Sequence, residues 1–337
     1  MKKFINDPEK VVDEMLAGLL AAHPDLIQSA RSDNKALVRA DAPRPGKVGI
    51  VTGGGSGHLP LFLGYVGVGL LDGVAVGEVF QSPSPEQILD ATRAVHGGEG
   101  VLYVYGNYGG DVMNFDMAAE LALAEEIKTD TVIGIDDVAS MPSDRRDERR
   151  GVAGIFFLYK CAGALAEEGA DLAEVAAIAR HAGDRTRTMG VALSPCIIPA
   201  VGKPGFTIGD GEMELGMGIH GEAGIERSSI KSAREVTSLM YEKLVADMPL
   251  AKGDRVGVLV NGLGATPLEE LYIVYGELQR LLSAAGVVIH RTYVGEYATS
   301  MEMAALSISL IKLDDELARL IDAPFVTPFH VQAAGRA

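Results

Sequence analysis

The sequence predicts an α/β protein of two domains, each with a sheet flanked by helices, and a substrate crevice between glycine-rich loops. Apolar strand-like runs such as KVGIVTG and GVLYVYGN alternate with helical segments such as FDMAAELALAEEI. The apolar runs are nearly continuous, which is typical of sheets covered on both faces. The length of 337 residues leaves room for two domains of ordinary size.

The elements of the first domain, residues 1–182, follow from hydrophobic periodicity. Asp7 and Pro8 suit the start of a helix, and apolar residues then recur at helical spacing up to Leu20. A further helix is expected to begin at Pro85. Strands are expected at residues 47–53, 100–107 and 131–137, and helices at residues 115–127, 150–169 and 171–183.

The second domain, residues 183–337, begins with a strand-like run near Thr186. Residues 202–224 are rich in glycine and poor in helix signals, and residues 300–313 are apolar. Strands are expected at residues 188–196, 254–262 and 287–295, and helices at residues 232–248 and 267–286.

Composition and charge exclude several kinds of binding partner. The net charge of −16 predicts repulsion from nucleic acid and from anionic membranes. The two cysteines, Cys161 and Cys196, form no zinc-binding pattern, and we expect both to be reduced and no metal site in this chain. The N-terminal segment MKKFINDPEK lacks the apolar stretch of a signal peptide. These observations predict a cytoplasmic protein.

The segment Gly53–His58 is the first candidate site. Four of its residues before His58 are glycines, and it directly follows a strand. Glycines allow close approach of a ligand to backbone N–H groups, and ligands of α/β folds usually bind at strand exits. A plain tight turn is the alternative. The segment has neither the lysine of a phosphate loop nor the acidic partner of a dinucleotide site, so no nucleotide is predicted here.

Two later loops carry groups suited to acid–base and nucleophilic chemistry. Asp111 follows paired glycines at a strand end and could act as a general base, although Asp, Asn and Gly are also common turn residues. His220 lies between small residues in GMGIHGE, where a neutral imidazole could attack a carbonyl carbon. Glu222 or a backbone carbonyl could hold its other nitrogen; a structural or surface histidine is the alternative.

Other charged residues have simpler interpretations. Asp136–Asp137 and Asp314–Asp315 are expected to cap strand ends or helix starts. The mixed run around Arg145, Arg146, Arg149 and Arg150 is expected to be a solvated face, or a contact for an acidic partner.

The motifs GGGSGH, NYGGDVMNF, MELGMGIHGE and NGLGATPLEELY occur in this order. In this order they resemble the K-subunit family of dihydroxyacetone kinases, and the resemblance covers nearly the whole chain. It implies a homodimeric enzyme subunit that holds a short ketose as a hemiaminal on His220. Asp111 is then the acid/base for the phosphorylated hydroxyl, and His58 hydrogen-bonds the substrate. The substrate-binding loops supply the remaining expected contacts, from Gly55, Ser56, Gly106, Asn107 and Tyr108.

The resemblance also implies a partner. A separate L subunit is expected to hold ADP or ATP and magnesium, so that this chain is a stand-alone substrate subunit with no cofactor of its own. The ultimate phosphate donor, ATP or phosphoenolpyruvate, is left open. The alternative function is a non-catalytic, ketose-binding co-activator of transcription. The presence of Asp111 and His58 beside His220 favours the enzyme.

Two departures from the family pattern concern the substrate. Gly106 stands where the family usually has a lysine that contacts the substrate, and Leu59 stands where it usually has a glutamate. A lost lysine predicts a longer, less positive crevice. The substrate is therefore expected to be dihydroxyacetone or a four-carbon ketose such as erythrulose.

Overall fold

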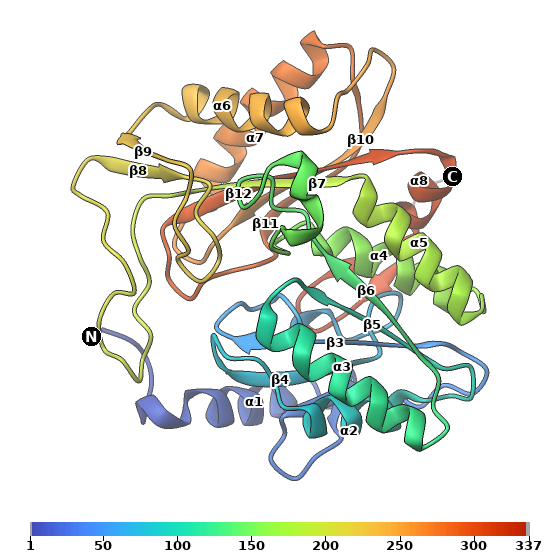
Figure 1. The fold of residues 1–337 in the computed structure, drawn as a ribbon. Coiled ribbons are helices and arrows are strands. Elements are labelled where there is room, and N and C mark those ends of the chain that lie inside the picture. The colour runs from blue at the N-terminus through green and yellow to red at the C-terminus, as the bar shows by residue number, and fades with distance from the viewer. Residues whose placement is uncertain (1, 335–337) are drawn as a thin grey trace.

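Two six-stranded sheets alternate with three helical layers in the computed structural model, which describes residues 2–334 (Figure 1). The first sheet has a parallel core of β4, β3, β5 and β6, to which β2 and β1 add antiparallel. Its strands, in spatial order, are β1 (Ile27–Ser29), β2 (Ala36–Arg39), β4 (Gly73–Val79), β3 (Gly49–Ser56), β5 (Val101–Gly106) and β6 (Thr129–Gly134).

Helices cover both faces of the first sheet. Along β5, Tyr103 packs with Phe115 in one apolar cluster, whereas Leu102 and Val104 belong to another. This alternation is the two-residue period of a strand buried on both sides. The first cluster contains α2 (Pro85–Val95) and α3 (Gly109–Ala124), and the second contains α4 (Ile155–Glu167) and α5 (Leu172–Asp184).

The second sheet is mixed, with one parallel pair, β10 and β11, and antiparallel pairs elsewhere. Leu259 and Ile311 turn toward the α4 layer, and Val258 turns toward α6 (Ala233–Asp247) and α7 (Leu268–Ala284). Its strands, in spatial order, are β11 (Val288–Glu296), β10 (Arg255–Gly262), β12 (Ala305–Leu313), β7 (Thr186–Ala192), β8 (Glu212–Leu215) and β9 (Glu226–Ser229).

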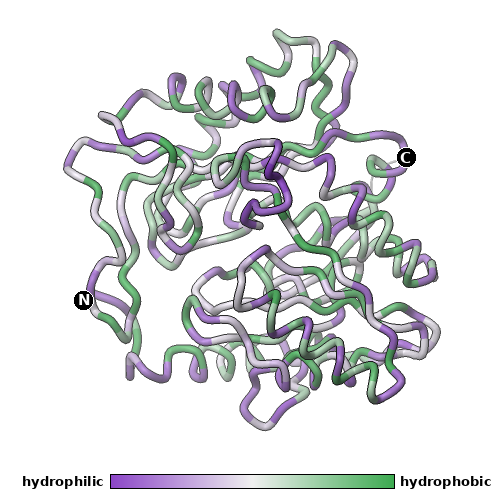
Figure 2. Tube along the Cα trace, in the orientation of Figure 1, coloured by the Kyte–Doolittle hydropathy of each residue, from purple (hydrophilic) through white to green (hydrophobic). Residues whose placement is uncertain are grey.

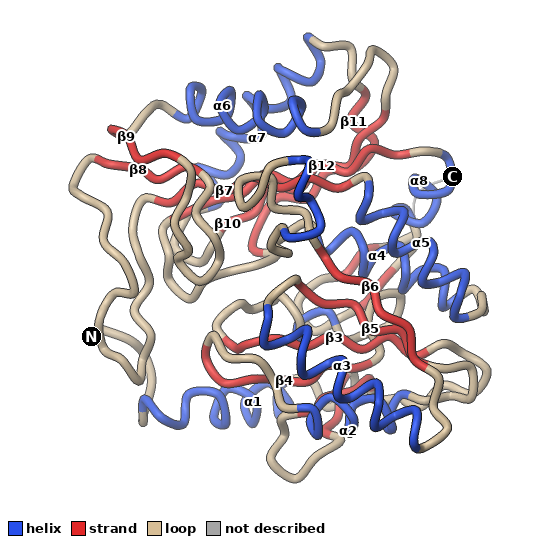
Figure 3. Tube along the Cα trace, in the orientation of Figure 1, coloured by secondary structure: helices blue, strands red, loops and turns tan. Residues whose placement is uncertain are grey.

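Shorter elements complete the chain. Figure 3 shows how loops join the layers, and Figure 2 shows hydrophilic residues along η3 (Ser143–Glu148). Ser84, Asp171 and Ser232 form capping boxes that begin α2, α5 and α6. The remaining elements are η1 (Pro8–Lys10), α1 (Val11–Ala22), η2 (Leu63–Tyr65), α8 (Asp315–Asp322), β13 (Phe325–Val326) and β14 (Val331–Gln332). No helix within residues 2–334 is long and apolar enough to cross a membrane.

The predicted fold class is confirmed, and differences in detail have local causes. The helix expected from residue 150 begins at Ile155 instead, because the Asp136 carboxylate accepts the backbone N–H groups of Val152 and Gly154 at 2.9 and 2.8 Å. We propose the domain boundary between residues 182 and 183. In support, the strands of the first sheet end at Gly134 and those of the second begin at Thr186.

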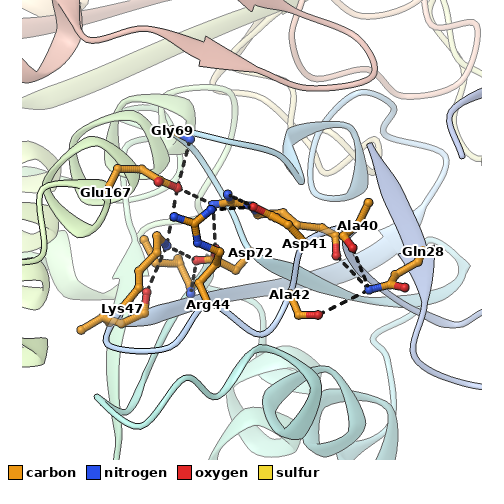
Figure 4. Close-up of polar contacts among 12 residues, drawn as sticks. Gln28, Ala40, Asp41, Ala42, Arg44, Lys47, Gly69, Asp72 and Glu167 are labelled. Carbon is orange, nitrogen blue, oxygen red and sulfur yellow. Dashed lines mark hydrogen bonds and ion pairs between the residues drawn. The ribbon is translucent and has the colours of Figure 1, made fainter. Parts of the chain in front are cut away.

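A buried charge cluster lies at the amino ends of β3 and β4 in the first sheet. Asp72, 3% exposed, accepts Arg39 Nη1 at 3.0 Å and Lys47 Nζ at 2.6 Å. Its second oxygen also accepts the Ile50 backbone N–H at 2.9 Å. The Arg39 guanidinium also pairs with Glu167 at the end of α4. Figure 4 shows Asp72, Lys47 and Glu167 converging, so the cluster joins the sheet to the middle helical layer.

We expect Asp72→Ala to destabilise the protein by about 3–5 kcal/mol, because it leaves two buried cations without their shared carboxylate. The midpoint of urea unfolding measures the loss. Asp184→Ala is the control, since its carboxylate is 68% exposed and pairs with Arg146 at the surface. That variant should change stability by less than about 1 kcal/mol. Equal, small effects of both substitutions would contradict the account.

Candidate active site

The candidate site lies at the carboxyl edge of the first sheet. The chain runs from β3 to β4 on one side, then crosses back through α2 to β5 on the other side of β3. This reversal between β3 and β5 is a topological switch point, where ligands of open α/β sheets bind. Gly53–Ser56 form the carboxyl end of β3, so only Gly57 and His58 of the GGGSGH segment follow that strand, and the NYGGD segment joins β5 to the first turn of α3. Both predicted segments therefore reach the same edge.

His58 is 1% exposed and is held on both ring nitrogens. Nδ1 is 2.7 Å from the Thr299 carbonyl oxygen, and Nε2 is 3.0 Å from Nε2 of His220. A carbonyl only accepts, so Nδ1 of His58 carries a hydrogen. Burial, aided by the charge of His220, lowers the pKa of His58 to about 3. His58 is therefore neutral in the resting site, and its Nε2 can accept a hydrogen bond.

Two phenylalanines in the left-handed backbone region enclose the His58 ring. Phe80 (φ 59°) stacks on it with centroids 4.8 Å apart, and Phe62 (φ 66°) meets it edge-on at 6.1 Å. Such strained residues cluster where a site demands them. The glycines of the loop make room, because a Cβ on Gly55 would lie 2.7 Å from the Gln81 backbone nitrogen. The glycine-rich sequence thus permits a tight aromatic enclosure.

His220 reaches this point from the loop between β8 and β9. Its Nδ1 lies 3.0 Å from Oε1 of Glu222, and its backbone N–H donates to Oε2 of the same residue at 2.9 Å. Burial alone would raise the pKa of Glu222, but the hydrogen bond and charge of His220, with the charge of Arg150, lower it to about 2. One ionised carboxylate therefore fixes both the main chain and the ring of His220.

The hydrogen-bond partners determine how many protons the pair of rings holds. Nδ1 of His220 faces an ionised carboxylate and must carry a hydrogen, as must Nδ1 of His58 opposite Thr299. The two Nε2 atoms, 3.0 Å apart, need one further proton between them. A proton placed between the two rings therefore belongs to Nε2 of His220 rather than to His58, whose pKa burial lowers.

Asp111 supplies a separate carboxylate in the first turn of α3. The residue is 5% exposed, and its Oδ1 has no hydrogen-bond partner among the described residues. Burial raises its pKa to about 6, while Ser82 and the charge of His220 offset part of that rise. A carboxylate with a free oxygen and this pKa is suited to take a proton near neutral pH.

The other predicted contact residues divide into two groups. Tyr108 lies edge-on to His220 with centroids 4.8 Å apart, and a Cβ on Gly106 would lie 3.2 Å from its ring. The side chains of Ser56 and Asn107 instead hold the loops. Ser56 Oγ donates to Gly77 O at 2.7 Å, and Asn107 Nδ2 donates to the carbonyls of Asp147 and Arg149 at 3.1 and 2.8 Å.

One prediction about charge is wrong. The run from Arg145 to Arg150 is not wholly a solvated face: Arg149 is 1% exposed and pairs with Asp247, and Arg150 pairs with Asp137. All six residues from 145 to 150 are charged, which is typical of a solvated face, but the carboxylates of Asp247 and Asp137 pair with two of them. Arg150, the Thr299 carbonyl and Phe80 were missed, since only the fold brings them to the histidines.

The fold and this geometry define a class: an α/β protein with paired histidines and a buried carboxylate at a sheet's carboxyl edge. The chain belongs to the dihydroxyacetone kinase K-subunit family, DhaK, since residues 17–329 match the Dak1 domain. The resemblance seen in the motifs is thereby confirmed.

Individual relatives cover the chain closely. It is 46% identical to "PTS-dependent dihydroxyacetone kinase 1, dihydroxyacetone-binding subunit DhaK" of Listeria innocua, over 94% of this chain and 95% of that protein. It is 43% identical to the D-erythrulose kinase of Mycolicibacterium smegmatis, over 100% of this chain but only 57% of that protein. The solved structure of the "Dihydroxyacetone kinase operon co-activator Dha-DhaQ" superposes with a TM-score of 0.88 at 31% identity, covering 96% of this chain and 99% of the other.

Proposed function

We propose that this chain is the substrate-binding subunit of a dihydroxyacetone-type kinase and holds a short ketose covalently on His220. The observation that carries the proposal is the contact between the two histidines beside a separate buried carboxylate. One ring is a nucleophile, the other a proton carrier, and the carboxylate a base. A covalent tether positions a substrate that has little surface for other contacts.

Formation of the hemiaminal uses only groups of this site. As the ketose approaches, the shared proton passes from Nε2 of His220 to Nε2 of His58, 3.0 Å away. The freed lone pair of His220 attacks the carbonyl carbon, and the C=O π bond breaks toward oxygen. That oxygen takes the proton from His58. The product carries an alkylated imidazolium on His220, paired with Glu222, and a neutral His58, so the total charge is unchanged.

Phosphoryl transfer then requires a base and a donor. Asp111 accepts the proton of the terminal hydroxyl, whose oxygen attacks the phosphorus of the donor, and the bond from that phosphorus to the rest of the donor breaks so that the donor leaves with the electron pair. We place the nucleotide and magnesium on a partner L subunit. Within residues 2–334 no three His, Cys, Asp or Glu side chains are grouped to hold a metal ion. The longer D-erythrulose kinase, of which this chain matches 57%, has room for a second functional region.

The partner and oligomer proposals follow from the same family membership. We infer a homodimer in the cytoplasm that docks an L subunit over the histidine pair, and no interaction with nucleic acid or membranes. The net charge of −16 supports the last point.

Reconstitution tests the proposed function. With an L subunit of a dihydroxyacetone kinase and its phosphate donor, the chain should phosphorylate a three- or four-carbon ketose. Alone with Mg·ATP it should show neither turnover nor tight binding by calorimetry. Turnover of ketose and ATP by the purified single chain would contradict the two-component proposal.

A non-catalytic co-activator is the second candidate, because the co-activator structure superposes so closely. A co-activator needs the tether but no base. Asp111, buried with a free oxygen, favours the kinase. Ketose-dependent binding of a transcription factor, without phosphorylation in the reconstituted system, would favour the co-activator.

The substrate prediction depends on Gly106. We expect kcat/KM for one erythrulose enantiomer to exceed that for dihydroxyacetone by about 10-fold, since a carbon unit is worth about 1–3 kcal/mol. A Cβ on Gly106 would lie 3.2 Å from the Tyr108 ring, so a lysine there must shift the ring by a few tenths of an ångström. Gly106→Lys should therefore move the preference back toward dihydroxyacetone. The change of preference, measured as a ratio of kcat/KM values in the reconstituted system, checks this; a tenfold preference of the wild type for dihydroxyacetone contradicts it.

A further inference from the structure

Arg150 lies behind the histidine pair, on the segment between η3 and α4. Its side chain is 15% exposed. Nε donates to Asp137 Oδ2 at 2.9 Å, and Nη2 lies 2.8 Å from the same oxygen. Asp137 is itself 3% exposed and accepts the Ala139 N–H at 3.0 Å. The guanidinium is therefore anchored within the first half of the chain.

The free end of the guanidinium points into the His220 loop. Nη2 donates to the Gly216 carbonyl at 3.3 Å, and Nη1 lies 3.8 Å from Oε2 of Glu222. At Gly218 a Cβ would lie 2.6 Å from Nη1, so the loop wraps closely around the ion pair. Arg150 thus connects Asp137 to the carboxylate that holds both the ring and the main chain of His220.

We propose that Arg150 is a positioning residue, which acts through Glu222 to keep the proton on His220 releasable. Its positive charge, with Nη1 3.8 Å from Oε2 of Glu222, offsets part of the negative charge of that carboxylate. The inference rests on the proposed function for its consequence in catalysis, but the protonation of the ring pair is measurable without substrate.

The sign follows from the charges around the rings. The carboxylates of Glu222, Asp111 and Asp137 favour the positive charge on the ring pair. Asp136 lies farther from the rings, and backbone N–H groups hold its carboxylate. Tyr108 contacts His220 as a neutral phenol, because burial raises its pKa well above the usual value. His58 is neutral, so Arg150 alone among these groups opposes the proton. Its removal leaves Asp137 and Glu222 uncompensated, and the pair should hold its proton more tightly.

The test is a pH titration of the ring nitrogens of ligand-free protein by NMR with nitrogen-15 histidine. In Arg150→Gln we expect the midpoint of the His58–His220 pair to move to higher pH by about one unit or more, the size of effect of a nearby unpaired carboxylate. Arg150→Lys keeps the charge but loses the two-nitrogen contact with Asp137, so it should give a smaller shift in the same direction. This variant replaces Arg150→Gln in the test if the glutamine variant does not fold. Arg145→Gln is the control, because Arg145 is exposed and pairs with Glu148.

The catalytic consequence is measured in the same variants. A shift of one pH unit in the titration midpoint should slow adduct formation with dihydroxyacetone at neutral pH about 10-fold or more in Arg150→Gln. The rate should be partly restored in Arg150→Lys. An unmoved midpoint in Arg150→Gln, even with weaker ketose binding at every pH, overturns the inference and leaves Arg150 a structural brace. If the wild-type protein forms no adduct, the proposed function fails, while the titration still decides the role of Arg150.

Discussion

Asp111→Asn should reduce kcat of the reconstituted kinase by roughly 10²–10⁴, the usual contribution of a general base. The amide is nearly isosteric but cannot take the proton of the substrate hydroxyl. The ketose adduct on His220 should still form, because that step uses only the two histidines. The separation of a lost kcat from retained adduct formation is therefore the expected result, measured by steady-state kinetics and by NMR of the bound ketose.

The pH profile gives a second readout of Asp111. Its folded pKa of about 6 is above the usual value, so the carboxylate is available as a base only above that pH. Turnover of the wild type should rise through about pH 6. Asp116→Asn is the control, since Asp116 is exposed on the same helix and should leave kcat and the profile unchanged. An Asp111→Asn variant with more than about half of wild-type activity would exclude the general-base role.

Burial of the Asp111 carboxyl group also makes the stability of the fold depend on pH. A carboxyl group whose pKa is raised on folding stabilises the fold below its ordinary pKa, and that contribution is lost as pH rises through the folded value, here about 6. As pH rises from about 4 to 7, the free energy of unfolding of the Asp111→Asn variant should therefore increase relative to that of the wild type, by up to about 3 kcal/mol. A constant difference between the two proteins across that range would contradict the buried, titrating carboxylate.

His220→Ala should weaken binding of dihydroxyacetone by about 100-fold or more, because a ketose this small makes few non-covalent contacts. His58 remains in place on the Thr299 carbonyl, so the loss reports the missing bond rather than a collapsed site. Calorimetry measures the affinity. His96→Ala is the control, at the end of α2 and outside the site. Unchanged affinity in His220→Ala would refute covalent binding.

Some long strands were predictable from the sequence, but β4 and β12, which are seven and nine residues long and largely buried, were not predicted as strands, and neither were the short ones. β5 and β10 are nearly continuous apolar runs that end in glycine, so composition and turn chemistry identify them, whereas β6, β7 and β11 also contain charged residues. β1, β2, β8 and β9 have three or four residues each, too few to establish a period of two. β9 is also largely exposed and polar, so no apolar run marks it.

The site was partly predictable. Glycine-rich segments identified His58, Asp111 and His220 as candidates, but nothing in their spacing shows that His58 and His220 touch, 162 residues apart. The partner of His220 Nδ1 stayed open between Glu222 and a carbonyl, because a loop of glycines has no fixed geometry before folding; the structure selects Glu222. Arg150 was hidden in a charged run. Its role depends on Asp137 and Glu222, which lie on different elements.

The central claim is a bond between Nε2 of His220 and the ketose carbonyl carbon. NMR of protein with nitrogen-15 histidine, mixed with dihydroxyacetone carrying carbon-13 at the carbonyl, tests it directly. We predict a saturated carbon resonance with a one-bond carbon–nitrogen coupling, present in the wild type and absent in His220→Ala. Bound ketose that keeps its carbonyl resonance, or a saturated carbon without that coupling, would contradict the account.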